Sequence, residues 1–325
     1  MSETLLIGAE DARRLLDMDS CIKAMKEVFG DISAGATAML QRTMLPMASG
    51  NMLAGMAALN EESGVCATKV IIFPGGHAAA ASSQGIVTLF DTRDGRLLAV
   101  VEAKGLTPRR TAAASAAATD LLANPDAETL VLMGAGKLAA AHLEAIRRVR
   151  PIRQVLVWAR SEEKGRAFCQ AHSDQELRPI YCAAPEEAVR QADILCTLTN
   201  AREPLVWGED LKEGVHINVV GACAPTVREV DTACVKRSRV FVDQYEASLR
   251  DGGDLLIPMQ EGAFHRDEIA GEIGEVALGR VQGRTSRQQI TLFESVGLAV
   301  QDLAAADLIR RRALQEGAGA TFSFS

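Results

Sequence analysis

The stretch Thr129-Leu-Val-Leu-Met-Gly-Ala-Gly-Lys-Leu-Ala139 decides the fold of this 325-residue chain. Its apolar opening predicts a short buried strand, and residues 137–149 predict a helix directly after it. The first glycine permits a tight turn, the second lets the backbone approach a pyrophosphate, and Ala139 is small enough for helix and strand to pack closely. A phosphate would then lie on the amide groups of the helix N-terminus. The residues predicted to line this turn are Gly134, Ala135, Gly136, Lys137 and Leu138.

Strands and helices alternate after this turn. Apolar runs predict strands at 154–158, 180–181, 193–198, 216–220 and 239–243, with a helix at 161–170 between the first two. Such alternation predicts an α/β fold with a Rossmann-type, doubly wound parallel sheet. A glycine pattern of this kind carries little information alone, but between a strand and a helix of such a fold it predicts dinucleotide binding.

The end of the second strand bears on which dinucleotide is bound. An NAD-specific site usually has an Asp or Glu here to hold the ribose 2′-hydroxyl. This chain has Arg160 and Ser161 instead, a pair suited to a 2′-phosphate. A solvated arginine beside a helix N-cap serine is the structural alternative. The pair favours NADP(H), with NAD(H) as the second candidate.

The two ends of the chain have a different pattern. Residues 1–35 predict helix, with Ile22, Met25, Val28 and Phe29 at helical spacing. Strands are predicted at 67–73, 85–90 and 97–101, the last two joined by a turn at Asp94-Gly95. An alanine-rich helix is expected over 110–119. A strand is predicted from residue 290, followed by a long helix up to 313 that should fold back onto this N-terminal part. Residues 317–325 are expected to lack regular structure.

Composition excludes several classes of function. The net charge is −7 and no basic tract is present, which argues against nucleic acid as the main ligand. The first residues lack the pattern of a signal peptide, and no apolar run is long enough for a membrane span. Seven cysteines without a C-x-x-C pair suit a reducing compartment, so we expect a cytoplasmic protein without a metal site.

Several motifs along the chain are those of one family. They are Gln41-Arg42-Thr43, Lys69 with Phe73-Pro74-Gly75, Gln84-Gly85, the block from Leu106 to Ser115, Gly134-Ala-Gly136, Cys196-Thr-Leu-Thr199 and Phe293-Glu-Ser-Val-Gly297. By these motifs the chain resembles the ornithine cyclodeaminase/mu-crystallin family. The resemblance implies a homodimer whose α+β substrate and dimerisation domain is built from both chain ends, here residues 1–120 with 298–325. The Rossmann domain would then be residues 121–297.

The resemblance also implies a substrate site. Arg42 and Arg110 would clamp the carboxylate of an α-amino or α-imino acid, and Lys69 would lie beside it and relay a proton. Taken alone, each cation would more often be a solvated surface charge. The further residues assigned to the cofactor by resemblance are Thr111, Thr197, Thr199, Gly221, Cys223, Ser295 and Gly297.

Cys223 departs from the cyclodeaminase pattern. Cyclodeaminases of this family have an aspartate at this position, and a thiol does not replace a carboxylate as a base. A small neutral residue beside the nicotinamide is the interpretation we favour over a nucleophile. The expected activity is therefore NAD(P)H-dependent imine reduction or amino-acid dehydrogenation. Ornithine cyclodeamination and a non-enzymatic, crystallin-like NADP-binding protein are the alternatives.

Overall fold

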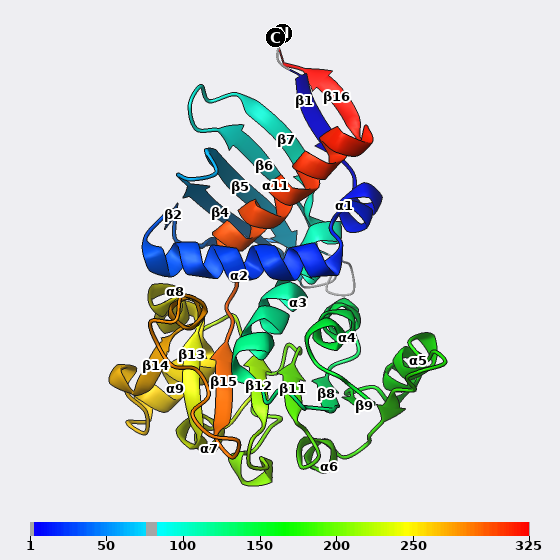
Figure 1. The fold of residues 1–325 in the computed structure, drawn as a ribbon, viewed down its shortest axis with the longest axis vertical. Helices are drawn as coiled ribbons and strands as arrows, with labels where there is room; N and C mark the ends of the chain where they lie inside the picture. The colour runs from blue at the N-terminus through cyan, green and yellow to red at the C-terminus, as the bar shows by residue number, and fades with distance from the viewer. Residues whose placement is uncertain (1–2, 76–82, 325) are drawn as a thin grey trace. The chain divides into compact units, whose positions relative to one another are not determined.

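The computed structural model describes residues 3–75 and 83–324, and it divides into two compact units (Figure 1). Unit 1 comprises Met1–Arg110 with Leu298–Ser325, and unit 2 comprises Thr111–Gly297. The boundary at residue 110 and the boundary expected from the sequence at residue 120 both fall inside helix α3 (Ala103–Leu122). That helix begins earlier than the 110–119 segment expected and contains Pro108.

Unit 2 is built on eight strands that are all parallel. Their order is β10-β9-β8-β11-β12-β15-β13-β14. From β8 the chain continues to β9 and β10 on one side, and it then crosses back to add β11 on the other side of β8. The strand order therefore reverses between β8 and β11, which is the usual place for a ligand in such sheets. This confirms the doubly wound sheet. The strands are β8 (Thr129–Met133), β9 (Gln154–Trp158), β10 (Ile180–Tyr181), β11 (Ile194–Thr197), β12 (His216–Val219), β13 (Ser238–Val242), β14 (Ile269–Glu272) and β15 (Ile290–Glu294).

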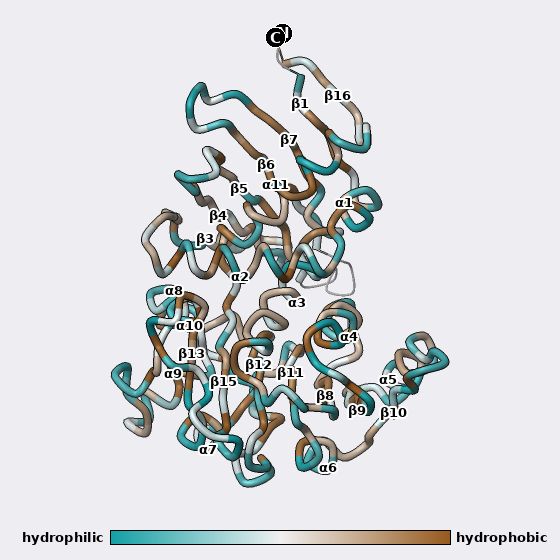
Figure 2. Tube along the Cα trace, in the orientation of Figure 1, coloured by the Kyte–Doolittle hydropathy of each residue, from teal (hydrophilic) through white to brown (hydrophobic). Residues whose placement is uncertain are grey.

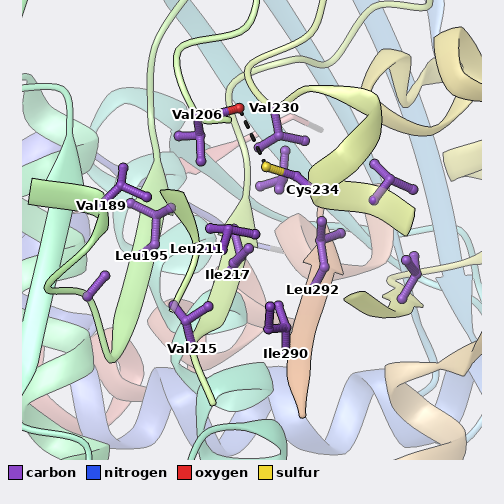
Figure 3. Packing of buried hydrophobic residues seen from close by; sticks show 14 of the residues in the cluster. Val189, Leu195, Val206, Leu211, Val215, Ile217, Val230, Cys234, Ile290 and Leu292 are labelled. Atoms are coloured by element: carbon purple, nitrogen blue, oxygen red, sulfur yellow. Dashed lines mark hydrogen bonds between the residues drawn. The ribbon is translucent and has the colours of Figure 1, made fainter. Parts of the chain in front are cut away.

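The central strands β8, β11, β12 and β15 are buried along almost their whole length because both faces of the sheet are covered. In Figure 2, β8 and β9 are largely brown. Figure 3 shows how Val206, Ile217, Val230 and Leu292 converge on one side of the sheet, where Cys234 Sγ donates to the Val206 carbonyl (3.5 Å). The helices are α4 (Lys137–Val149), α5 (Glu162–Ala171), α6 (Pro185–Val189), α7 (Thr232–Arg237), α8 (Tyr245–Asp251), α9 (Gly253–Gln260) and α10 (Ile273–Ala277).

Unit 1 contains a mixed sheet in the order β16-β1-β7-β6-β5-β4-β2, with β3 also paired to β4. Two expectations at the chain ends are wrong. The segment Glu3–Ile7, expected to be helical, is strand β1, and β16 (Ala320–Ser323) lies within the tail expected to be irregular; Met1, Ser2 and Ser325 are outside the described residues. Strand β16 pairs with β1 from the opposite chain end, and β1 also pairs with β7. No local pattern reveals such pairings. The other strands are β2 (Thr37–Met39), β3 (Thr43–Pro46), β4 (Met52–Asn60), β5 (Val65–Phe73), β6 (Gln84–Asp91) and β7 (Leu97–Glu102).

Besides the start of α3, the helices found in the described part of unit 1 pack on its sheet or on one another. They are α1 (Ala9–Leu15), α2 (Met18–Ala34) and α11 (Ala299–Glu316). The residues of α2 expected to face the core, from Ile22 to Phe29, are buried as predicted. Helix α11 packs on β4, β5 and α2, which confirms that the C-terminal helix returns to the N-terminal part (Figure 1). None of the helices in the described ranges is long and apolar enough to cross a membrane.

Strand β5 shows the alternation that positions the candidate site. Val65, Ala67, Lys69 and Ile71 are buried, whereas Thr68, Val70 and Ile72 between them are exposed. Successive side chains of a strand point to opposite faces of the sheet. Lys69 therefore shares a face with the apolar core of unit 1, on the side where α11 packs.

Candidate active site

Two predicted cations of unit 1 meet at a carboxylate that the sequence analysis did not identify. Lys69 Nζ donates to Asp302 Oδ1 (2.9 Å) and to Thr107 Oγ1 (3.0 Å). Arg110 Nε donates to the same Asp302 oxygen (2.9 Å). Strand β5, helix α3 and helix α11 each contribute one of these charged groups. We call Lys69, Arg110 and Asp302 the cation cluster.

Burial and charge perturb the protonation of the cluster. The side chains of Lys69 and Asp302 are only 4% and 1% exposed. Burial lowers the pKa of Lys69 to about 8; Asp302 opposes this change, while Arg110 and Arg42 add to it. Burial alone would raise the pKa of Asp302, but the charges of Arg110 and Lys69 outweigh it and lower that pKa. The cluster thus holds two cations against one ionised carboxylate.

Gln301 is a second residue that the sequence analysis missed. Its Oε1 accepts from Arg110 Nη1 (2.8 Å) and from the backbone N–H of Leu298 (3.2 Å). Gln301 Nε2 and Asp302 Oδ2 are buried without a hydrogen-bond partner among the described residues. The one available signal was that Gln301 and Asp302 are polar residues in an otherwise apolar first turn of α11. A buried polar atom without a partner marks a place where a ligand or water can bind.

Arg42 lies near the cation cluster. It is half-buried in the connection between β2 and β3, and its charge contributes to the lowered pKa of Lys69. The structure therefore brings together all three cations predicted for the substrate carboxylate. Arg109, next to Arg110 in the sequence, is half-buried and donates from Nε to the Leu16 carbonyl (2.6 Å).

In unit 2 the predicted phosphate turn has the geometry that a dinucleotide needs. Gly134 has a φ of 131°, and a Cβ there would lie 3.0 Å from the Leu198 carbonyl oxygen, so the position requires glycine. Gly136 is the N-cap of α4, makes no side-chain cap, and would have open space around a Cβ. Ala139 is buried. The helix N-terminus thus presents an uncrowded backbone surface of the kind that binds pyrophosphate.

Glu229 links two of the loops assigned to the cofactor. Its Oε1 accepts from the backbone N–H and the hydroxyl of Thr199 (both 2.6 Å), and its Oε2 accepts from the N–H of Gly221 (2.7 Å). A Cβ at Gly221 would lie 2.1 Å from the Thr199 carbonyl oxygen, so this loop passes too close for any side chain. Thr197 is fully buried at the end of β11.

Three further carboxylates lie buried in unit 2, and with Glu229 we call them the acid cluster. Asp254 Oδ1 accepts from the backbone N–H groups of Glu229 (2.7 Å) and Val230 (2.8 Å). Asp243 Oδ2 accepts from the N–H of Gly297 (3.0 Å). Glu294, at the end of β15, is fully buried, and both burial and the neighbouring acids raise its pKa well above the ordinary value. Burial likewise raises the pKa of Asp254 to about 7, with Glu229 adding to the effect.

The remaining predicted residues of unit 2 differ in their surroundings. Cys223 is exposed, and its Sγ donates to the Val220 carbonyl (3.3 Å). Ser295 is buried directly after β15, and Thr111 is buried in α3. Arg160 is exposed just after β9, and Ser161 accepts from the N–H of Lys164 (3.3 Å) as the N-cap of α5. Ser161 therefore has the role of a helix N-cap, which was the structural alternative to binding a 2′-phosphate.

The predicted cofactor residues follow the carboxyl ends of β8, β9, β11, β12 and β15, apart from Thr111. This is the edge where parallel sheets of this type bind ligands. In the described ranges, no group of three or more His, Cys, Asp or Glu side chains is arranged to hold a metal ion.

Comparison with known proteins identifies the family. A family model described as the ornithine cyclodeaminase/mu-crystallin family matches residues 2–317. The Delta(1)-pyrroline-2-carboxylate reductase of Bacillus cereus is 37% identical over 325 residues, covering 98% of this chain and 100% of the relative. The Thermococcus litoralis enzyme of that name, solved with NADH and L-proline, matches with a TM-score of 0.94 at 32% identity, over 98% of this chain and 99% of the other.

A second solved structure has the same fold over its whole length. An archaeal alanine dehydrogenase dimer with bound NAD matches with a TM-score of 0.94 at 30% identity, and each chain is covered completely. These matches confirm the resemblance first indicated by the motifs around Arg42, Lys69, Arg110 and Gly134. The chain belongs to the ornithine cyclodeaminase/mu-crystallin family.

Proposed function

We propose that the protein is a nicotinamide-dependent reductase of C=N bonds that are adjacent to a carboxylate. The observation that carries this proposal is the cation cluster, in which Lys69 and Arg110 share one oxygen of Asp302. Two cations against one carboxylate leave a positive charge in excess, which a substrate carboxylate would neutralise. A buried charge without such a partner is costly, so the site favours an anionic ligand.

The relatives support a cyclic α-imino acid as the substrate. The Bacillus cereus relative is a reductase of pyrroline-2-carboxylate, and the Thermococcus litoralis structure contains L-proline, the corresponding reduced ring. In pyrroline-2-carboxylate the C=N carbon carries the carboxylate. We therefore propose this compound, or a close cyclic homologue, as the substrate of the present chain.

The residues of unit 1 have separate tasks in this proposal. Asp302 and Gln301 occupy Nε and Nη1 of Arg110. Nη2 then remains for a substrate carboxylate oxygen, because the planar guanidinium donates in fixed directions. Lys69 adds charge beside the carboxylate and is a proton source. Arg42 adds a further cation at the less buried side.

The residues of unit 2 fit a dinucleotide. The backbone from Gly134 to Leu138 would hold the pyrophosphate, and the cofactor, when bound, supplies the hydride that the substrate carbon accepts. We propose NADP(H) as the preferred form, because Arg160 follows β9 where an acid would mark NAD. The solved relatives carry NADH and NAD, so this preference distinguishes the present chain from them.

We also propose a homodimer formed through the outer face of the unit 1 sheet. Val70 and Ile86 are directly opposite each other on β5 and β6, and both are exposed. Leu45 on β3 and Ile72 on β5 are both exposed and both lie opposite Leu53 on β4, so they share this face. A contiguous apolar face of this kind marks an interface. The archaeal relative is a dimer, which makes a second copy of the chain the expected partner.

The function is tested by following the absorbance of the reduced nicotinamide with pyrroline-2-carboxylate and either NADPH or NADH. We expect steady oxidation of the cofactor, and almost none in the Arg110→Ala variant. L-Ornithine is the matched control substrate. Release of ammonia from ornithine without net change of the cofactor would establish a cyclodeaminase and overturn the proposal. Binding of cofactor without turnover of any imino acid would favour the crystallin-like alternative.

The dimer is tested separately by light scattering. Ile86→Lys should give a monomer, because it places a charge within the apolar face. Ile180→Lys, at an exposed isoleucine of β10 in unit 2, should leave the dimer intact. A parent protein that is monomeric at micromolar concentration would contradict the proposal.

A further inference from the structure

One carboxylate organises two cations that come from distant parts of the chain. Asp302 lies 233 positions from Lys69 and 192 from Arg110, yet its Oδ1 accepts from both. We propose that Asp302, with Gln301 beside it, is the positioning residue of the active site: it aims Arg110 at the substrate carboxylate and keeps Lys69 protonated as the acid of the reaction. This inference rests on the proposed reductase function and adds a residue and a role to it.

The orientation of the Arg110 guanidinium follows from its hydrogen bonds. Asp302 holds Nε and Gln301 holds Nη1, so two of the three guanidinium nitrogens are fixed from one turn of α11. A planar group fixed at two points has a single orientation. Without Asp302 the side chain would be anchored only by the neutral amide of Gln301. Loss of this orientation costs more than the bond itself, since catalysis depends on the placement of the reacting groups.

The protonation of Lys69 follows from the surrounding charges. Its ammonium is buried and faces Arg110 on α3 and Arg42 in the β2–β3 connection, both of which disfavour its charge. Asp302 on α11 is the charged group that favours it, and Thr107 on α3 contributes a neutral hydroxyl. Removing the carboxylate would leave cations and burial unopposed, and the pKa of Lys69 would fall below its present value of about 8.

The proposed reaction requires a protonated Lys69. Reduction of an imine adds a hydride to carbon and a proton to nitrogen. The hydride comes from the cofactor, which is oxidised, and the C=N π pair forms the new N–H bond with a proton from Lys69 Nζ. Lys69 then recovers a proton from water. A neutral Lys69 cannot donate, so activity should fall as the pH rises through the Lys69 pKa.

The test compares Asp302→Asn with Asp307→Asn. Both changes remove a buried negative charge from α11, but Asp307 pairs with Arg310 and Arg311 rather than with the cation cluster. For Asp302→Asn we expect KM for the imino acid to rise at least about tenfold, as for the loss of a charged hydrogen bond. The basic limb of the kcat profile should move to lower pH by about one unit. Asp307→Asn should retain the KM and the pH profile of the parent.

A second measurement does not depend on turnover. The Lys69 side chain can be titrated by NMR in protein labelled at lysine, with Lys69→Met to assign its signal. We expect its midpoint to fall in Asp302→Asn and to return toward the parent value in Asp302→Glu. Asp302→Glu also serves if the Asn variant does not fold.

The outcomes separate the two proposals. A parent that reduces no imino acid would overturn the proposed function, whereas the Lys69 titration would still decide the role of Asp302. An active parent together with an Asp302→Asn variant that keeps its KM, its pH profile and its Lys69 midpoint would overturn the present inference. A variant that only loses thermal stability would show that Asp302 is structural.

Discussion

The cation cluster of unit 1 and the acid cluster of unit 2 are both buried, but they resolve their charges differently. In the cation cluster, Lys69 and Arg110 surround a single carboxylate. In the acid cluster, Glu229, Asp254 and Asp243 accept hydrogen bonds from backbone N–H groups, and Glu229 also accepts one from the Thr199 hydroxyl. The first arrangement has an excess of positive charge, and the second links the loops that follow β11, β12 and β15.

The pKa of a buried aspartate is therefore shifted in opposite directions in the two units. The pKa of Asp302 is lowered, because Arg110 and Lys69 outweigh the effect of burial. The pKa of Asp254 is raised to about 7, because burial is reinforced by Glu229. Both aspartates are almost completely buried. Burial alone thus does not decide whether an acid is charged; the sign of the neighbouring charges does.

The largest expected effect comes from breaking the cation cluster at its substrate side. Arg110→Ala removes the planar anchor and leaves Asp302 with Lys69 alone. Loss of one partner of a buried, hydrogen-bonded charge pair with a ligand costs about 2–5 kcal/mol of binding, so kcat/KM for the imino acid should fall by up to about a thousandfold. Arg109→Ala removes the same charge one residue earlier and should retain most of the activity. Similar losses in both variants would mean that the helix, not the cluster, had been damaged.

A smaller effect is expected when one charge is removed from the acid cluster. The pKa of Asp254 is raised from 3.8 to about 7 in the folded protein, so the folded state holds a proton that the unfolded state releases. Stability of the parent should therefore fall as the pH rises between about 4 and 7. Asp254→Asn lacks this titrating carboxyl group, so its free energy of unfolding should depend less on pH. Its change between pH 5 and pH 8 should be smaller than that of the parent by an amount on the order of 2 kcal/mol.

Urea unfolding at the two pH values measures this difference. Asp251→Asn is the matched control, since Asp251 lies in the same region but pairs with Arg250. It should keep the slope of the parent. A parent that becomes more stable from pH 5 to pH 8, with Asp254→Asn unchanged in slope, would contradict the raised pKa.

The smallest effect concerns the cofactor side of unit 2. Arg160→Ala should weaken kcat/KM for NADPH by about tenfold, the usual loss for one charged hydrogen bond, and leave NADH nearly unchanged. Arg153→Ala removes another exposed charge, directly before β9, and should affect neither cofactor. An equal loss with both cofactors, or a parent that prefers NADH, would refute the NADP(H) preference.

The sequence predicted unit 2 better than unit 1, for a physical reason. The bounds of β8, α4 and β9 match the predicted segments, because a buried parallel strand is apolar throughout and Gly134 marks its end. Strand β4 (Met52–Asn60) was missed, since its alanines and glycine do not alternate with polar residues. Strands β1 and β16 depend on each other across the whole chain.

The site shows the same division. Lys69, Arg110 and Arg42 were found through family motifs, whereas their counter-ion was not. Asp302 has no local signature of function, because an acid in the first turn of a helix is common for reasons of the helix dipole. Its importance arises only when α11 is packed against β5 and α3. Contacts formed over such sequence separations are a property of the fold and not of a pattern.

The position of α11 also determines when the active site is completed during synthesis. Unit 2 is one continuous segment, so it can fold on the ribosome as soon as it has emerged, while unit 1 must wait for residues 298–325. Until then Lys69 and Arg110 lack the carboxylate that balances them, and β1 lacks β16. We therefore expect a chain that ends at Gly297 to keep a protease-resistant unit 2 and to lose its first 110 residues to digestion. The nascent chain would complete its proposed substrate site only after α11 has been synthesised and packed.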